Sequence, residues 1–407
     1  MPRISTAAVI LSLLIAGTVT AMDTRVDPET QRIRTLLGGL PSQGVGWAGW
    51  PVTFLYVIDD PRFDVRAPLP HLGLDTPMID LQHSLRMARI YLPRSYESFL
   101  ENTDLVILAN IDVRVFTPQN IRWFRDGVLE EGLGLTMTGG SQGFGGYGGF
   151  PSWGETFIGP ILPVDCFEGE HSKSYTPKLK IVAEDNELAM SLPWEDAPCF
   201  FPYNFVEIRD GATVIIESRD EKHTPIHFYW DVGEGRVVGC QNIFGVFGCN
   251  FMDWEYFQDS VLNVYYYAVG LPLPDDLVVV HEIRRKWYEY GMERKLLLSM
   301  IEFADRFNAN LMKVEEQIDG LDAMKKNADD LYLAQSYPEA LRAIEEAMAE
   351  SARLSGLTIE AKNLALFWIY VIEWLTVMGT LMITGAVTWT LMVRRSMFKE
   401  VGSTRNI

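Results

Sequence analysis

Residues 133–149 read LGLTMTGGSQGFGGYGG, and they carry the clearest signal of the fold class. Its first five residues are an apolar run of strand length, and a glycine-rich turn follows at once. Upstream, residues 105–109 form another apolar strand, and Thr117-Pro118 opens a helix that ends at Gly132. Strands that alternate with helices predict a parallel sheet covered on both faces, with a ligand crevice beyond the C-terminal strand ends. The glycine-rich turn lies where that crevice is expected.

Further segments fit the same α/β pattern. The first half adds predicted strands over 52–58 and 86–92 and a short helix over 95–102, capped by Ser95. Residues 178–238 are rich in β-forming segments, and a helix over 253–268 closes the domain. The strongest of these β segments are 213–217, 227–232 and 236–240. This second half is expected to add antiparallel strands to the sheet or beside it.

Residues 275–360 are charged and helical in pattern, with no proline between 276 and 327. Apolar residues recur there in a four-three rhythm, which buries one face of a helix against another: Phe307, Leu311, Val314, Ile318 and Leu321. The pattern resumes after Pro338. One continuous helix over residues 276–327 would be a stalk about 75 Å long. The alternative is an antiparallel hairpin. The hairpin is favoured because the second stripe needs a helix to pack against, and self-association or a protein partner is expected through this region.

The N-terminus has the pattern of a secretory signal peptide. Arg3 is followed by an apolar run and then by small residues up to Ala21, the order that predicts cleavage after Ala21. An uncleaved anchor helix is the alternative, but the run is short for crossing a bilayer. Residues 1–21 are therefore assigned to the signal peptide, and 22–45 to an N-terminal extension.

Residues 364–393 are predicted to form a transmembrane helix. The part over 374–393 contains no charged residue, and about 20 such residues span a hydrocarbon core. Aromatic side chains near both ends of the run suit the membrane interfaces. The tail, 394–407, holds four basic residues, Arg394, Arg395, Lys399 and Arg405. The positive-inside effect then predicts a single-pass protein of the cell membrane, with the lipid bilayer as a partner, a cytoplasmic tail and an extracytoplasmic folded part.

Composition limits the partners. The 407-residue chain has a formal net charge of −19, and no basic patch in the folded part offsets it, so nucleic acid is excluded as a partner. A potentially oxidising compartment favours one or two disulfides among four cysteines: Cys166, Cys199, Cys240 and Cys249. Their spacing does not fit a zinc site, and neither a metal nor a cofactor is expected.

The glycine-rich strand and turn, the strand over 105–109 with its following helix, and Ile161-Leu-Pro-Val164 resemble the class I glutamine amidotransferase-like superfamily. The closer likeness is to its uncharacterised membrane-associated branch. The resemblance implies a flavodoxin-like α/β sandwich over residues 46–272. The fold expected for the whole chain is this sandwich with additional antiparallel strands, then the helical hairpin or stalk, then one C-terminal transmembrane helix.

Comparison with the catalytic motifs of that superfamily implies that this chain has no catalytic triad. Active members of the superfamily carry a cysteine nucleophile on the tight turn, with a histidine and a glutamate after a later strand. Here the turn over 138–141 reads TGGS, and the later strand reads GCQNIFG over 239–245. Ile243 and Gly245 stand where the histidine and the glutamate are implied. No catalytic residue is therefore assigned, and an inactive domain that binds a ligand or a protein partner is expected.

Two other functions stay open. One is an extracytoplasmic hydrolase with a non-standard nucleophile, for which Ser141, Cys240 or Cys166 are the candidates. The other is a purely structural protein that assembles through its helical region.

Two groups of residues are candidates for ligand binding. The backbone N–H groups of the glycine turn suit an anionic ligand, and they belong to Gly139, Gly140, Ser141, Gln142 and Gly143. Asp59 and Asp60 form the second group, as a calcium site or an acid pair, although aspartates before a proline are also typical turn formers. His223 and His227 would share one face of a strand, which alone is a weak basis for a metal site.

Overall fold

The structure is a computed structural model that describes residues 24–38, 60–67, 85–86, 88–90, 92–170, 178–198, 200, 204–241 and 251–403. The proposed signal peptide, the strand predicted over 52–58 and Asp59 lie outside these residues. The chain divides into two compact units. The first, here called the α/β unit, comprises residues up to 288 together with 331–338, and the helical unit comprises 289–330 and 339–407.

The described part of the α/β unit contains an eight-stranded sheet in the order β2-β1-β3-β4-β10-β9-β8-β6. The strands β2, β1, β3, β4 and β10 are parallel, whereas β9, β8 and β6 continue the sheet antiparallel. Their bounds are Ile33–Gly38 (β1), Phe63–Ala67 (β2), Leu105–Ala109 (β3), Gly134–Thr138 (β4), Leu179–Ile181 (β6), Thr213–Ser218 (β8), Pro225–Val232 (β9) and Gly235–Cys240 (β10). The prediction of an α/β fold with added antiparallel strands is confirmed.

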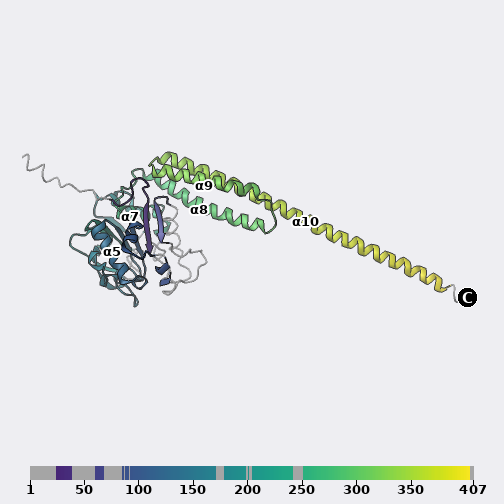
Figure 1. The fold of residues 1–407 in the computed structure, drawn as a ribbon, viewed down its shortest axis with the longest axis horizontal. Coiled ribbons are helices and arrows are strands. Elements are labelled where there is room, and N and C mark those ends of the chain that lie inside the picture. Colours follow the sequence, from purple (N-terminus) through teal and green to yellow (C-terminus); the bar gives the residue numbers. More distant parts are fainter. Residues whose placement is uncertain are drawn as a thin grey trace, which may run out of the picture. The chain divides into compact units, whose positions relative to one another are not determined.

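Helices cover both faces of this sheet, and β3 shows why. Leu105 and Ile107 point into a core shared with α7, while Val106 and Leu108 point into a second core shared with α5. Successive strand residues face opposite sides, so an uninterrupted apolar run needs a cover on each side. In the described part of this unit the α-helices include α4 (Tyr96–Glu101), α5 (Pro118–Glu131), α6 (Glu187–Met190) and α7 (Phe257–Ala268), the larger of which are labelled in Figure 1.

Local sequence signals place the ends of α4 and α5. The Ser95 side chain accepts a hydrogen bond from the Ser98 N–H group and caps α4. Thr117 and Asn120 form a capping box at α5, and Gly132 ends it in a left-handed conformation, with φ of 70°. The predicted cap at Ser95 and the predicted start and end of α5 are confirmed.

Shorter elements complete the unit. A separate two-stranded antiparallel sheet pairs β5 (Val164–Glu170) with β7 (Asn204–Ile208). The 3₁₀ helices are η1 (Val113–Val115), η2 (Trp153–Glu155), η3 (Gly159–Ile161), η4 (Trp194–Asp196) and η5 (Phe251–Asp253).

The structure differs from the expected elements at two places in the first half of the chain. The strand predicted over 86–92 is wrong, because the described residues 85–86 and 88–90 are helical. Ala88 and Leu92, four apart and joined by a backbone hydrogen bond, both pack on the α5-side core, which is the spacing of a helix face. In addition, β1 comes from the segment treated as an N-terminal extension, so the sheet begins before residue 46.

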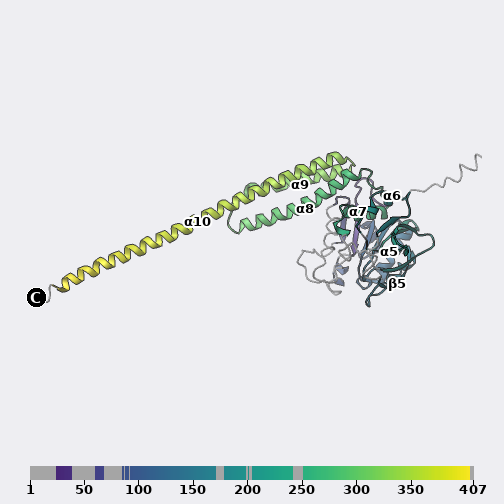
Figure 2. The same cartoon turned by 180° about the vertical axis from the view of Figure 1, so that it is seen from behind.

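Three long helices follow: α8 (Leu277–Asp305), α9 (Met312–Leu333) and α10 (Tyr337–Ser403). Within the helical unit, α8, α9 and the first part of α10 lie side by side in both Figure 1 and Figure 2. The chain turns between α8 and α9, so the helical region contains the hairpin rather than one continuous stalk, and α10 adds a third helix. Pro338 is the second residue of α10, a position where its missing N–H costs nothing.

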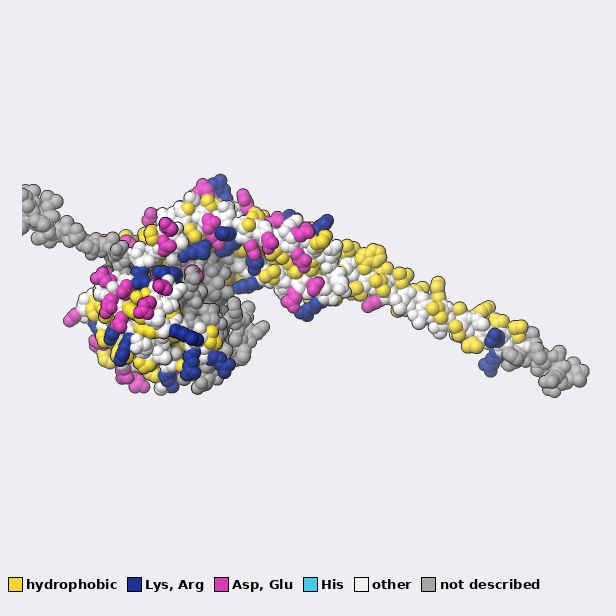
Figure 3. Space-filling model, viewed as in Figure 1, with side chains coloured by type: hydrophobic (Ala, Val, Ile, Leu, Met, Phe, Trp, Pro, Cys, Tyr) yellow, Lys and Arg dark blue, Asp and Glu magenta, His cyan; other side chains and the backbone are white. Residues whose placement is uncertain are grey.

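The distal part of α10 continues beyond its neighbours as a single helix. Figure 3 shows hydrophobic side chains on its surface, with basic side chains close to its C-terminal end. The apolar window of this helix has a mean hydropathy of 1.8 and none of it is buried within the chain. Among the described residues, α10 is the one helix that is long and apolar enough to cross a membrane.

Candidate binding site at the glycine turn

The glycine turn lies at the C-terminal edge of the parallel strands, as predicted. It leaves β4 at Thr138 and passes directly against the end of the neighbouring strand β10. The Gly139 N–H group donates to the carbonyl oxygen of Cys240 at 2.7 Å. A Cβ atom on Gly139 would lie 1.9 Å from the carbonyl oxygen of Gln241, so only glycine fits here.

Most N–H groups of the turn already have acceptors within the protein. Gly140 donates to Asn204 Oδ1 at 2.9 Å, and Gln142 donates to Asn110 Oδ1 at 2.7 Å. The Asn204 amide in turn donates to the carbonyl oxygens of Gly140 and Gly143, at 3.0 and 3.1 Å. Gly143 donates back to the Gly140 carbonyl at 3.1 Å. Asn204, which is buried, and Asn110, which is half-buried, therefore clamp the turn, and no local sequence pattern predicts either contact.

Ser141 is the exception within the turn. It is half-buried, and neither its N–H group nor its hydroxyl makes a hydrogen bond to the described part of the chain. A serine hydroxyl needs a neighbouring base to act as a nucleophile. Of the turn residues predicted to bind a ligand, Ser141 is thus the one that keeps its polar groups available.

Asp60 lies far from this turn along the sheet. It precedes β2, whose first residue Phe63 pairs with Ile33 at the start of the parallel strand β1. Asp60 therefore belongs to the N-terminal edge of the parallel strands, whereas the glycine turn belongs to the C-terminal edge. The structure separates the two groups of candidate ligand residues.

Asp60 instead takes part in a buried charge cluster, defined here as Asp60, Arg62, Asp259, Tyr266 and Arg284. The Tyr266 hydroxyl donates to Asp60, and Arg284 Nε lies 3.7 Å from the same carboxylate. Arg284 Nη1 donates to Asp259 Oδ1 at 2.7 Å. Arg62 and Arg284 stack on the Tyr266 ring, at 5.1 and 5.2 Å from its centroid.

The carboxylates and tyrosines of this region shift the pKa values of the neighbouring cations. Burial by itself would lower the pKa of Arg284, but the neighbouring Tyr332, Tyr266, Asp259 and Asp60 outweigh burial and hold that pKa well above its usual value. A hydrogen bond from His281 to Asp259 raises the pKa of His281. Arg284 is ion-paired with both carboxylates, and all five side chains are buried, which is the signature of a structural cluster rather than of a calcium site.

The described cysteines differ in their surroundings. Cys166, in β5, is a free thiol, and burial raises its pKa to about 12. Cys240, the last residue of β10, lies with its sulfur 4.0 Å from Nε2 of His227, its register partner in β9. Cys199 and Cys249 lie outside the described residues, so the predicted disulfides stay predictions.

His227 and His223 do not share a site. His227 is completely buried against the rings of Trp194 and Phe200, and burial lowers its pKa to about 3, which makes it a neutral imidazole. His223 stands at an exposed turn before β9 with its Nδ1 atom 2.8 Å from Glu217. No cluster of metal-ligating side chains occurs among the residues that the structure describes.

An exposed pair of phenylalanines flanks the glycine turn. Phe167 of β5 and Phe205 of β7 are cross-strand partners with exposed fractions of 45% and 42%. Gly145 of the turn approaches β5 so closely that a Cβ atom would lie 1.9 Å from the Phe167 carbonyl oxygen. Sequence reasoning missed this pair because neither β5 nor β7 was predicted.

Comparison with known proteins identifies the part of the chain that holds these features. Residues 99–269 match the family model described as "Putative glutamine amidotransferase". Similar solved structures include two cytoplasmic proteins from Salmonella typhimurium, STM1381 of strain LT2 and STM3548, at 18% and 17% identity. Each alignment covers 57% of this chain and 98% of the other, with a TM-score of 0.45. No curated protein matches the sequence.

Proposed function

Because residues 99–269 form a glutamine amidotransferase-like domain, we propose that the chain is a membrane-anchored binding protein that uses this domain without amidotransferase chemistry. Its recognition surface is the C-terminal edge of the parallel strands. There the glycine turn and the exposed phenylalanine pair, Phe167 and Phe205, receive a protein partner.

The missing nucleophile supports a non-catalytic role. The turn carries Ser141 where active relatives of the superfamily carry cysteine. The Cys166 thiol stays protonated at neutral pH because its pKa is about 12, and a protonated thiol is a poor nucleophile. Cys240 and His227 form the one close thiol–imidazole pair among the described residues, but both are completely buried in the core, out of reach of a substrate.

The histidines that the structure describes support the same role. His223 contacts Glu217, His281 contacts Asp259, and His227 is enclosed by aromatic rings. None of these three hydrogen-bonds Ser141, so no described imidazole activates its hydroxyl. A hydrolase that uses Ser141 is the second candidate, favoured only by the unoccupied hydroxyl of that residue.

The exposed phenylalanine pair carries the proposal of a protein partner. Cross-strand aromatic pairs stabilise a sheet, but two rings left more than two-fifths exposed on one face also keep apolar area in water. Aromatic side chains are enriched at the centres of protein interfaces, where their burial contributes most of the binding energy. The asparagine clamp holds the adjoining turn rigid, and a rigid surface binds with less loss of entropy.

Anchoring completes the proposal. The distal part of α10 crosses the membrane, and the basic residues after it face the cytoplasm, so the α/β unit is extracytoplasmic. The partner is then another extracytoplasmic or membrane protein.

We expect a photo-crosslinker at position 167 to capture the partner. Phe167 is replaced by p-benzoylphenylalanine in the full chain, expressed in its native membrane, and the adduct is detected on a denaturing gel. The control position is Val182, which is 44% exposed. It follows β6, the edge strand of the eight-stranded sheet, whereas Phe167 belongs to the separate two-stranded sheet. The adduct should form from position 167, not from 182, and should fall several-fold when Phe205→Ser is added. Equal adducts from both positions, or an adduct insensitive to Phe205→Ser, would contradict this surface.

A further inference from the structure

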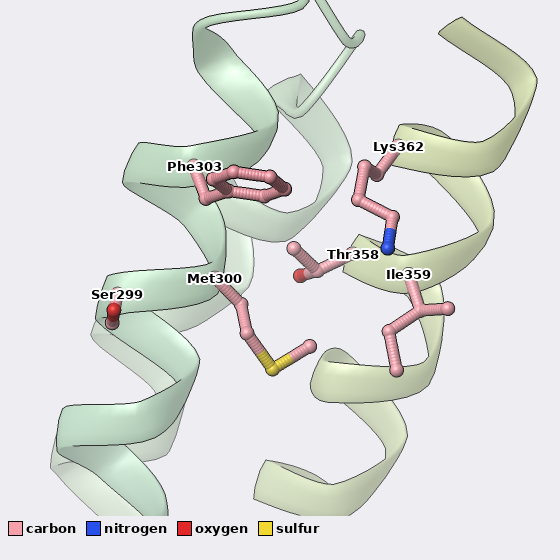
Figure 4. Close-up of a pocket in the computed structure, with 6 residues that line it drawn as sticks. All are labelled: Ser299, Met300, Phe303, Thr358, Ile359 and Lys362. Atoms are coloured by element: carbon pink, nitrogen blue, oxygen red, sulfur yellow. The ribbon is translucent and has the colours of Figure 1, made fainter. Parts of the chain in front are cut away.

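A cavity of about 260 Å³ lies within the helical unit, between the C-terminal part of α8 and the middle of α10. It is lined by Ser299, Met300 and Phe303 from α8 and by Thr358, Ile359 and Lys362 from α10. Figure 4 shows Phe303, Met300, Thr358 and Lys362 converging on the space between the two helices. One side of this space is apolar, and the other carries an ammonium group.

The polar lining suits an anion. Lys362 is half-buried and makes no ion pair with any described residue. Glu302, adjacent to Phe303 in α8, is engaged by Arg306 at 2.8 Å. An ammonium group that lines a cavity and has no ion-pair partner among the described residues can bind one phosphate group.

The apolar lining suits hydrocarbon next to that anion. Phe303 and Ile359 are 48% and 43% exposed although both face the cavity, and Met300 lies between them. Met292 and Leu296, exposed on α8, continue this apolar stripe. Small-molecule sites usually start at about 300 Å³, so the cavity holds a headgroup and the first carbons of its chains rather than a whole lipid.

The position of the cavity along α10 matches the headgroup layer of a bilayer. The helix is unbroken from Tyr337 to Ser403. With a rise of about 1.5 Å per residue, the predicted span over 364–393 measures roughly 45 Å, which is the thickness of a bilayer including its headgroups. Lys362 precedes that span by only two residues, so its ammonium group lies at the level of the outer phosphates.

We propose that this cavity binds the headgroup of an anionic phospholipid from the leaflet next to the helical unit. The Lys362 ammonium pairs with the phosphate, and Phe303, Met300 and Ile359 contact the glycerol and the first methylenes. The inference rests on the membrane anchoring proposed above. A bound lipid would tie α8 to α10 and set the depth at which the helical unit stands on the membrane.

Lipid retention tests the site directly. The full chain is reconstituted in vesicles of an equal mixture of phosphatidylcholine and phosphatidylglycerol, floated on a density gradient, extracted and examined by native mass spectrometry. Phosphatidylglycerol should be retained over phosphatidylcholine by about fivefold, the factor expected for one lysine at a charged membrane surface. Lys362→Gln should abolish this preference, and Phe303→Ala should lower the total lipid retained. Lys326→Gln, at an exposed position on α9, should change nothing.

The outcomes separate this inference from the proposed anchoring. If the wild-type chain does not float with any vesicle, the anchoring itself is wrong. If the chain floats but retains both lipids equally, or if Lys362→Gln keeps the preference, the lipid site is wrong. If a cysteine placed at Ile359 cross-links two copies of the chain in vesicles, a second copy occupies the cavity instead.

Discussion

Substituting Arg284 by methionine is expected to lower the free energy of unfolding of the α/β unit by about 3–5 kcal/mol. Arg284 is 1% exposed and is bound to Asp259, with Asp60 close by. Methionine fills similar space but leaves two buried carboxylates without their cation, and an uncompensated buried charge is costly. Urea unfolding of the full chain in detergent, followed by tryptophan fluorescence, measures the loss.

The neighbouring arginine is the matched control. Arg285 is half-exposed and pairs with Glu282 at 2.6 Å on the surface of α8. Such pairs contribute about 0.3–0.5 kcal/mol, so Arg285→Met should have little effect. If the two substitutions cost the same, the buried charge cluster is not what stabilises this end of the sheet.

Replacing Gly139 by alanine is expected to cost about 3 kcal/mol or more, because the clash is with backbone and has no easy relief. The new Cβ would lie 1.9 Å from the Gln241 carbonyl oxygen. Neither partner can withdraw freely, since the Gly139 N–H group is bonded to Cys240 in the adjoining strand. The variant should unfold at lower urea or accumulate poorly, and protease resistance of the domain in membranes provides a second readout.

Gly148→Ala is the control for the same loop. Gly148 has a left-handed backbone, with φ of 69°, but unlike Gly139 it has no atom within 4 Å of a Cβ placed there. Its expected cost is therefore only the backbone strain, about 1 kcal/mol. Equal losses from the two variants would show that the turn is not locked against β10.

What the sequence predicted well was local. The Ser95 cap, the helix start at Thr117-Pro118 and the glycine that ends α5 depend on contacts within five residues, so local residue types predict them. The glycine turn was likewise placed at the correct strand end. The long apolar run in α10 could be found by counting, because the capacity of a helix to cross a membrane depends on its length and composition.

What the sequence could not predict depends on distant contacts. Asn110 and Asn204 clamp the turn from 32 and 64 residues away, and nothing in their own neighbourhoods marks them. β1 lies between β2 and β3, an order that only the folded sheet defines. Asp60 was predicted as a second candidate ligand residue, yet its carboxylate accepts a hydrogen bond at the opposite edge from Tyr266, 206 residues along the chain.

The surroundings of the cysteines and histidines also depend on distant contacts. Even spacing put His223 and His227 on one predicted strand face, but β9 begins at Pro225 and leaves His223 in a turn. Cys240 and His227 meet because β9 and β10 pair antiparallel, a register that neither segment reveals alone. Because both side chains are buried, the His227 imidazole is neutral and a substrate cannot reach the pair.

We expect the glycine turn to carry no working nucleophile. Labelling of the intact chain in membranes with a fluorophosphonate serine probe tests this expectation, with Ser141→Ala beside the wild type. The wild type should be labelled no more strongly than the variant. Labelling of the wild type that disappears in Ser141→Ala would contradict it.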